Sequence, residues 1–576
     1  MKKLTYLLAI LALNVCIGKI NAQEFLKAQN KSIVRENGER IILRGMGLGG
    51  WMLQEGYMFG LADLGQQYRI KEAITKTLGN EKTAQFYQKW LANHTTKADI
   101  DSMAAWGFNS IRLPMHYRLY TLSIEEEPIK GKQTWLEEGF TLTDSLLSWC
   151  KANGVYLILD LHAAPGGQGN DLPIADRNPD LPSLWESTAN QDKTVALWGK
   201  LAERYANEPM IGGYDLLNET NWGFEDVSDK IGNKEQKNEP LRKLFIRITQ
   251  EIRRVDKKHM IILEGNAFAN NYKGIEPNWD DNMVISFHKY GNFADVASIQ
   301  HFLDLREQYN LPLWLGEAGE NANTWFTNTI RLMEDQNIGW SWWPNKKLGI
   351  NNPLSVKRPE GYDQVVNAWT KDEKLPDNAA AILNELGDNL HVKRNVIHKD
   401  VIDAMFRQVN DWTTIPFKQH LLNKELRILA VDYDLGRNNA AYFDNDSCSY
   451  RFVNGINTTG NKGSQYRNDG VDIKKDKSGD GFHIFSIEDN EWLLYTINVK
   501  NAGKYTLTVE ASSEGSNGIL SIEVGQQKNE VAITETPDSE WNNYDSGSVF
   551  LEEGANTIKV VAEKGGFLLK AVCLKQ

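Results

Sequence analysis

Eight short apolar segments alternate with longer amphipathic segments between about residues 40 and 345. These eight segments are Ile41–Met46, Phe108–Leu113, Val155–Leu161, Gly212–Leu217, Met260–Leu263, Met283–Phe287, Leu313–Leu315 and Ile338–Trp342. Such alternation is typical of repeated βα units around a parallel sheet. Because eight parallel strands close naturally into a barrel, the pattern predicts an α/β fold, the (β/α)8 or TIM barrel.

The segments between the predicted strands indicate where helices and loops lie. Apolar residues recur near every 3.6 positions, which predicts an outer ring of helices, in Phe140–Ala152, Thr194–Tyr205, Leu241–Val255 and Ala297–Tyr309. The longest connections follow strand ends: Trp51–Arg69, Met115–Trp135, Ala163–Leu184 and Gly223–Pro240. We expect the active site at that face of the barrel.

The chain of 576 residues is too long for one core, since cores stop growing near about 250–300 residues. After residue 420, short alternating strands are separated by Gly, Asn and Ser turns; they are Trp492–Val499, Lys504–Ala511, Ile519–Val524 and Thr557–Ala562. This pattern predicts an all-β jelly-roll or β-sandwich. We place the barrel domain at residues 23–420 and the sandwich at residues 427–576.

The N-terminus has the pattern of a signal peptide at residues 1–22. Lys2 and Lys3 precede the apolar run Leu4–Ala12, and a small, polar stretch ends at Ala22. No later stretch approaches the roughly 18 apolar residues of a membrane span. We therefore predict an exported protein, periplasmic, at the cell surface or extracellular, without an integral span. A lipid anchor at Cys16 is the second interpretation.

Charge and cysteine content limit the partners. A net charge of −12 disfavours nucleic acid and anionic membranes and does not oppose a neutral substrate. Cys150, Cys448 and Cys573 lack metal-ligand spacing, so we predict no metal and no cofactor. We expect Cys150 to be a buried thiol, and a Cys448–Cys573 disulfide stays open.

Two glutamates end predicted strands of the same barrel. Glu219 closes the stretch Gly213–Glu219, and Glu317 closes Leu313–Glu317. Either glutamate alone is equally well a solvated strand-end carboxylate. Together, two carboxyl groups at one face are what glycoside cleavage requires, one to protonate the leaving oxygen and the other to attack the anomeric carbon or activate water.

Other polar and aromatic residues also follow strand ends: Arg112, His162, His288, Tyr290, Trp342 and Trp343. A buried histidine is usually a hydrogen-bonded core residue, and a lone arginine is usually solvated. Gathered around one cleft, however, such groups can set the protonation of two carboxyl groups in opposite directions.

These motifs resemble glycoside hydrolase family 5 across most of residues 40–345. They are Ile111-Arg112-Leu113-Pro114, Asp160-Leu161-His162, Asn218-Glu219, His288-Lys289-Tyr290, Gly316-Glu317 and a strand-eight Trp. The resemblance implies a retaining β-glycoside hydrolase with Glu219 as acid/base and Glu317 as nucleophile. Retention implies carboxyl groups about 5–5.5 Å apart.

The resemblance also implies substrate-binding roles. Asn218 would bind the sugar 2-hydroxyl, and Arg112 with Tyr290 would hold Glu317 ionised. His288 would lie near Glu219, and His162 would line the −1 subsite, the position of the sugar that is attacked. Trp343 aligns best as the platform under that sugar, with Trp342 as its rival.

Within the family, the stretches Gly45–Glu55 and Leu161–Gln168 look most like the exo-β-1,3-glucanase branch, which makes β-glucan the leading substrate class. By that likeness Glu55 would bond the terminal sugar. Trp51 is a further predicted sugar contact at the rim. The chain departs from this branch at Gly47 and Gly56, where Asn and Pro are usual.

Residues Ala430–Lys575 resemble carbohydrate-binding module family 6. The motifs are Ala430–Gly436, Tyr466–Asp472, Glu491–Thr496, Trp541 and Gly565–Phe567. The resemblance implies that Tyr466 and Trp541 flank a sugar. Lys570 replaces the usual sugar-binding Asn, and Leu429 and Val431 replace calcium ligands, so we predict no calcium there.

Three alternatives to a β-glucanase remain. The same chemistry could act on mannan, xyloglucan, xylan or a terminal glycoside, or the protein could bind glycans without cleaving them. A metal-dependent hydrolase is disfavoured, because His162 and His288 lack paired-ligand spacing. In each case the predicted partner is a polysaccharide or oligosaccharide, and the linkage, exo or endo attack and the oligomeric state stay open.

Overall fold

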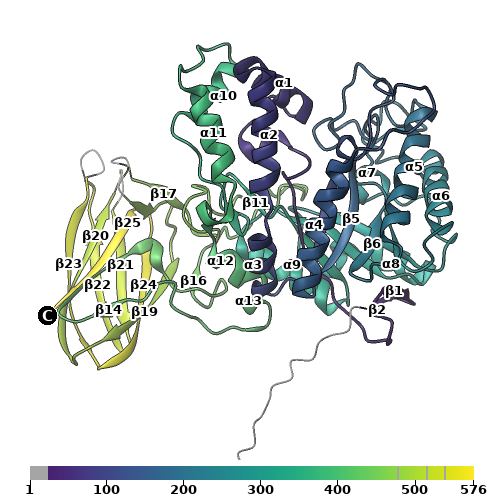
Figure 1. The fold of residues 1–576 in the computed structure, drawn as a ribbon. Coiled ribbons are helices and arrows are strands. Elements are labelled where there is room, and N and C mark those ends of the chain that lie inside the picture. The colour runs from purple at the N-terminus through teal and green to yellow at the C-terminus, as the bar shows by residue number, and fades with distance from the viewer. Residues whose placement is uncertain (1–23, 477–478, 480, 514, 516, 537–539) are drawn as a thin grey trace, which may run out of the picture.

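The computed structural model describes residues 24–476, 479, 481–513, 515, 517–536 and 540–576, so the predicted signal peptide lies outside the described residues. Eight parallel strands close into a barrel in the order β10-β3-β4-β5-β6-β7-β8-β9 (Figure 1). Their bounds are β3 (Arg44–Gly47), β4 (Ser110–His116), β5 (Tyr156–Ala163), β6 (Ile211–Asp215), β7 (Met260–Glu264), β8 (Met283–Lys289), β9 (Leu313–Gly319) and β10 (Gly339–Trp343). Each overlaps one predicted strand, which confirms the TIM barrel.

Helices surround the barrel, and four of them overlap the predicted ones: α4 (Glu137–Asn153), α5 (Thr188–Tyr205), α6 (Glu239–Arg253) and α8 (Gln300–Tyr309). In α6 the buried residues Leu241, Leu244, Phe245, Ile248 and Ile252 recur at helical spacing. This apolar stripe faces the core, which is why the segment packs as a helix on the sheet.

An unpredicted helical insertion follows β3. Helices α1 (Gln67–Leu78) and α2 (Asn80–His94) pack with α10 (Tyr362–Thr370) and α11 (Ala379–Asn389), which come after β10 (Figure 1). Their shared core includes Ile70, Trp90, Tyr362 and Leu383, together with Trp343 from the end of β10. The insertion therefore reaches the face of the barrel where the site is expected.

The C-terminal part folds into two packed antiparallel-rich sheets, with β14-β19-β24-β21-β22 in one and β17-β18-β25-β20-β23 in the other. The first contains β14 (Leu421–Leu422), β19 (Trp492–Val499), β21 (Gly518–Val524), β22 (Gln527–Ile533) and β24 (Gly554–Lys564), with β16 (Tyr442–Phe443) beside β19. The second contains β17 (Ile473–Lys475), β18 (Phe482–Ile484), β20 (Gly503–Ser512), β23 (Asn542–Leu551) and β25 (Leu568–Lys575), with β15 (Glu425–Leu429) beside β25. These strands include the four predicted ones and confirm the all-β second part.

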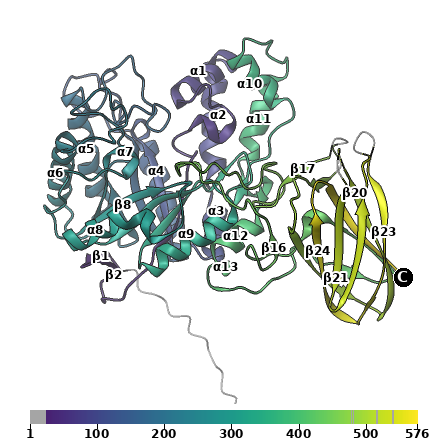
Figure 2. The same cartoon turned by 180° about the vertical axis from the view of Figure 1, so that it is seen from behind.

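The sandwich lies against one side of the barrel, next to α9 (Asn323–Asp335) and α12 (Lys399–Met405) (Figures 1 and 2). Cys150, Cys448 and Cys573 are free thiols, so the open Cys448–Cys573 disulfide is not formed. Cys448 packs with the core around the barrel, whereas Cys573 lies on β25 in the sandwich. Over the described residues, we find no helix both long and apolar enough to cross a membrane.

Candidate active site

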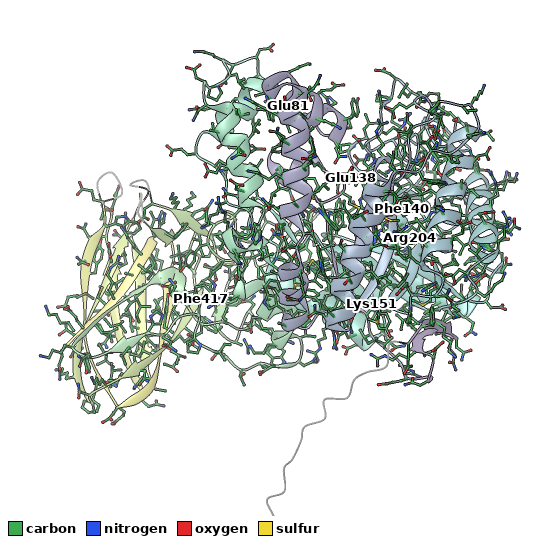
Figure 3. All side chains as sticks on the ribbon, in the orientation of Figure 1. Glu81, Glu138, Phe140, Lys151, Arg204 and Phe417 are labelled. Atoms are coloured by element: carbon green, nitrogen blue, oxygen red, sulfur yellow. The ribbon has the colours of Figure 1, made fainter. Side chains whose placement is uncertain are left out.

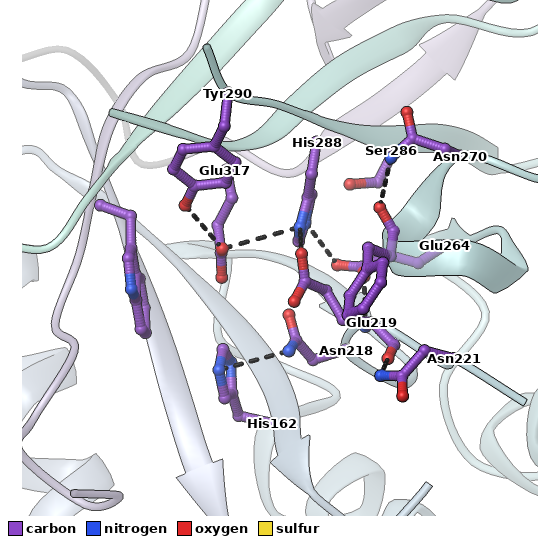
Figure 4. Close-up of polar contacts among 12 residues, drawn as sticks. His162, Asn218, Glu219, Asn221, Glu264, Asn270, Ser286, His288, Tyr290 and Glu317 are labelled. Atoms are coloured by element: carbon purple, nitrogen blue, oxygen red, sulfur yellow. Dashed lines mark hydrogen bonds and ion pairs between the residues drawn. The ribbon is translucent and has the colours of Figure 1, made fainter. Parts of the chain in front are cut away.

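The predicted polar residues meet at the carboxyl ends of the barrel strands (Figure 4). Arg112 lies on β4, His162 on β5, His288 on β8 and Glu317 on β9, while Asn218 and Glu219 lie just beyond the end of β6 at Asp215. Tyr290 is the first residue after β8. Because all strands of the barrel are parallel, residues that are far apart in the sequence converge at this face.

Arg112 is the centre of the arrangement and is fully buried. Its guanidinium donates hydrogen bonds to Glu317 Oε1 at 2.6 Å, Asn218 Oδ1 at 2.9 Å, Glu264 Oε1 at 2.8 Å and Asp215 Oδ2 at 2.9 Å. A buried guanidinium requires such partners, because an unpaired charge in the interior is very costly. Arg112 thereby fixes side chains from β6, β7 and β9 relative to one another.

Glu317 is held from two sides. Besides the bond from Arg112, the Tyr290 hydroxyl donates to Glu317 Oε2 at 3.0 Å (Figure 4). Burial raises the pKa of the Glu317 carboxyl, and the charge of Glu219 adds to this, against the lowering effects of His288 and Arg112. A protonated Glu219 would remove one of the raising effects, so the state with Glu219 as an acid is also the state that favours an anionic Glu317.

Glu219 contacts the imidazole of His288. His288 Nδ1 lies 2.6 Å from Glu219 Oε1, and His288 Nε2 lies 3.1 Å from Glu264 Oε1. Although burial alone would lower it, the carboxyl groups of Glu264, Glu317 and Glu219 raise the pKa of His288 well above its ordinary value. The ring is therefore a proton donor to both of its bonded neighbours.

His162 contacts both Asn218 and Trp343. His162 Nδ1 faces Asp160 at 2.7 Å and therefore carries a proton, which leaves Nε2 to accept from the Asn218 amide at 3.2 Å. The imidazole stacks on the Trp343 ring, with centroids 5.0 Å apart and planes 8° from parallel. Asn218 keeps one amide hydrogen for a further partner.

The two rival tryptophans point in different directions. Trp343 contacts His162, and Gly49 lies against its ring, where a Cβ would come 2.7 Å from Trp343 Cζ2. Trp342 packs instead on Phe326 and Trp340, away from the site residues. This alternation is expected for neighbouring strand residues, and of the two rings it is Trp343 that contacts the site residues.

Glu55 joins the cluster, whereas Trp51 does not. Glu55 Oε1 lies 3.9 Å from His162 Nε2, and burial, with the charges of Glu317 and Glu219, raises the pKa of Glu55 well above its ordinary value. Trp51 is 1 % exposed, and its indole donates to the Leu91 carbonyl of α2. The α1–α2 insertion covers this ring, so its placement does not favour the predicted sugar contact.

Glu264 is a site residue that sequence reasoning missed. It ends β7 and accepts hydrogen bonds from Arg112 and from the Glu219 backbone N–H at 2.7 Å. Burial raises its pKa, but His288 and Arg112 outweigh burial and lower the value to about 2. The signal was available, because Met260–Glu264 is an apolar strand that ends in a carboxylate, like the strand before Glu317.

Glu219, His288 and Glu317 form the one group of described residues whose ligand atoms could meet at a metal ion, within 4.8 Å of one another. Both His288 nitrogens face carboxyl groups, and the raised pKa of the ring favours the protonated form, which has no lone pair for a metal. Arg112 supplies a second positive charge. These residues therefore do not fit a metal centre.

The two predicted sugar contacts of the sandwich are separated. The Tyr466 ring packs on Phe482 at 4.8 Å, whereas the Trp541 ring packs on His483 at 5.2 Å. Phe482 and His483 are consecutive residues of β18, and consecutive strand residues point to opposite faces. The Tyr466 and Trp541 rings therefore contact opposite faces of β18.

Two family models match the chain. Residues 71–349 match cellulase (glycosyl hydrolase family 5), and residues 464–572 match carbohydrate binding module family 6. The first match covers β4–β10 and all of the clustered residues except Glu55. The second covers most of the sandwich.

Curated relatives fall in the same group. The chain is 29% identical to a β-xylosidase of Phanerodontia chrysosporium over 59% of this chain and 74% of that protein. It is 29% identical to endoglucanase C of Acetivibrio thermocellus over 37% of this chain and 56% of that protein. It is 25% identical to a probable glucan 1,3-β-glucosidase A of Aspergillus fumigatus over 44% of this chain. The matches span only 56% of the endoglucanase and of the glucosidase.

Proposed function

We propose that the barrel, whose residues 71–349 match glycosyl hydrolase family 5, hydrolyses β-glycosidic bonds with retention of configuration, with Glu219 as acid/base and Glu317 as nucleophile. The observation that supports this proposal most directly is the distance between the two carboxyl groups. A carboxyl oxygen of Glu219 lies within 4.8 Å of one of Glu317. Retaining enzymes hold these groups about 5–5.5 Å apart, whereas inverting enzymes leave about 6.5–9.5 Å for a water molecule.

In the first step, Glu317 attacks the anomeric carbon while Glu219 gives its proton to the leaving oxygen. The bond between the sugar and the leaving group breaks, and a covalent glycosyl-enzyme on Glu317 forms. Arg112 and Tyr290 orient the attacking carboxylate from opposite sides. The remaining amide hydrogen of Asn218 is suited to the sugar 2-hydroxyl, a contact that strengthens in the transition state.

In the second step, Glu219 takes a proton from water, which attacks the same carbon and releases Glu317. His288 stays beside Glu219 throughout, and its positive charge stabilises the carboxylate that forms there after the first proton transfer. Two inversions at one carbon give net retention.

We propose a β-glucan as the substrate. The motifs around Glu55 and His162 support this choice, as do an endoglucanase and a probable glucan 1,3-β-glucosidase among the relatives. Because one relative is a β-xylosidase, a β-xyloside is the first alternative substrate. Export, predicted from residues 1–22, would bring the enzyme to polymeric substrates outside the cell. In the sandwich, a sugar contact would rest on Trp541 alone.

A substrate panel tests this function. The purified mature protein is incubated with β-1,3-, β-1,4- and mixed-linkage glucans, xylan and mannan, and the released sugars are identified over time, with Glu317→Ala as the control. Glucose or short gluco-oligosaccharides from the wild type alone would support the proposal. Release from xylan or mannan alone would overturn the substrate but not the chemistry, and no release would favour glycan binding without cleavage.

A further inference from the structure

The segment that follows Glu317 is hydrogen-bonded to the sandwich. After β9 the chain passes through Asn321 and enters α9 at Asn323. The Asn321 amide donates to the Ser449 carbonyl at 2.7 Å and accepts from the Ser449 N–H at 2.9 Å. A side-chain amide that pairs with both backbone groups of one residue fixes that residue in distance and in orientation.

A buried polar network continues this contact. The Asn468 amide donates to the Asn321 carbonyl at 2.8 Å and to Asn323 Oδ1 at 3.0 Å, and the Asn323 N–H donates to the Asn468 carbonyl at 2.8 Å. Asp400 of α12 accepts from the Asn468 N–H at 2.7 Å and from the Asn323 amide at 2.9 Å. Asn323 and Asp400 are each 1 % exposed, so these bonds are shielded from water.

The sandwich side of this network is itself rigid. Arg467 is fully buried, and it donates to Asp469 Oδ2 at 2.6 Å while its guanidinium lies 3.6 Å from the Tyr433 ring centroid and 4.5 Å from that of Phe417. Phe417 lies where the barrel meets the sandwich (Figure 3). Asp469 in turn accepts from the Asn323 amide at 3.0 Å. The turn formed by residues 466–469 is thus held by contacts within the sandwich and by hydrogen bonds to the barrel domain.

The segment just after Ser449 also contacts the loop after β8. The Phe452 N–H donates to the Gly291 carbonyl at 3.1 Å, and a Cβ at Gly291 would come 2.8 Å from Arg451 Cγ. Gly291 follows Tyr290, whose hydroxyl binds Glu317. The sandwich therefore contacts the segments next to Glu317 and next to its tyrosine partner.

We infer that contacts with the sandwich keep the proposed nucleophile in position. Asn468 and Asn321 are the positioning residues that hold the segment after Glu317. This inference rests on the proposed function of Glu317. It assigns the 466–469 turn to docking on the barrel rather than to sugar binding, and it predicts a sandwich that does not move independently of the catalytic domain.

The test uses the full chain with Asn468→Ala and Asn321→Ala. Asn501→Ala, at an exposed asparagine of the sandwich, is the matched control. Hydrogen exchange is measured on peptides covering residues 313–325 and 283–292, and kcat and KM are measured on the substrate that the panel identifies. Misplacement of a reacting group by about 1 Å can cost about 100-fold in rate. We expect faster exchange in the 313–325 peptide and a kcat lower by about 10- to 100-fold, with KM changed less than about twofold.

The pH profile separates positioning from general destabilisation. Burial raises the pKa of Glu317 and Arg112 lowers it, so a displaced Glu317 should shift the acidic limb of kcat/KM, whereas simple loss of folded protein would scale the profile without shifting it. Unchanged exchange in the 313–325 peptide for both variants would overturn the inference. Hydrogen exchange needs no substrate. A protein with no activity on the substrate panel would therefore refute the proposed function, and the exchange result would still be readable.

Discussion

The Glu264 carboxylate accepts the backbone N–H of Glu219 at 2.7 Å while its other oxygen binds Arg112 at 2.8 Å. One carboxylate thus connects the backbone of the proposed acid/base to the guanidinium that orients the proposed nucleophile. Glu219 has a φ of 36°, in the left-handed region that non-glycine residues rarely adopt, and this bond helps to hold it there.

Glu264→Ala should therefore destabilise the fold as well as lower activity. Removing one partner of a buried ionic network costs about 3–5 kcal/mol, because Arg112 and His288 lose a neutralising charge. Urea unfolding measures the loss. Glu203→Ala, at an exposed glutamate paired with Lys200, should change the unfolding free energy by less than about 1 kcal/mol. Equal stability of the two variants would refute a central role for Glu264.

Glu219→Gln should lower kcat by about 10²–10⁴-fold on substrates whose leaving group needs a proton. Aryl glycosides with acidic phenol leaving groups should lose much less in the first step, because they depart without protonation. The difference is measured as kcat/KM on a matched pair of good and poor leaving groups, because kcat/KM reports the first step whereas kcat also contains the second step, in which Glu219 is the base. The same loss on both would contradict an acid role for Glu219.

Trp343 and Trp342 should give different phenotypes. Trp343→Ala removes the ring that stacks on His162, so we expect a higher KM or lower kcat in addition to the loss of stability that follows from its place in the core. Trp342→Ala empties a buried site beside Phe326 and Trp340 and should cost about 3–5 kcal/mol of stability. Steady-state kinetics and thermal unfolding are measured on both variants. A loss of stability in Trp343→Ala without a change in kcat or KM would reject Trp343 as the platform.

His288 should make stability fall as pH rises. Its folded pKa is raised well above the unfolded value near about 6.5, so the folded state holds the extra proton between these two values. The stabilisation is complete below about pH 6.5 and is lost as pH rises through the folded pKa. The Tm difference between wild type and His288→Gln should therefore narrow with rising pH. A difference that widens would contradict a protonated His288.

The sequence predicted the barrel and most of the site because both depend on local patterns. Arg112 and Glu317 lie on apolar strands and Glu219 follows one, and parallel strands bring their ends together. Glu264 has the same context but no accompanying motif, so the sequence alone does not single it out. The burial of Trp51 beside α2 had no such signal, because α2 in turn packs on α11, which follows β10 in the sequence. Pairings between such distant segments leave no local signal.

The stereochemistry of hydrolysis tests the central claim most directly. Proton NMR of the anomeric signals is recorded in the first minutes of hydrolysis of a β-linked substrate, before the released sugar equilibrates between its anomers. A double displacement through Glu317 predicts that the β-anomer appears first. Initial release of the α-anomer would mean a single displacement by water and would contradict Glu317 as the nucleophile.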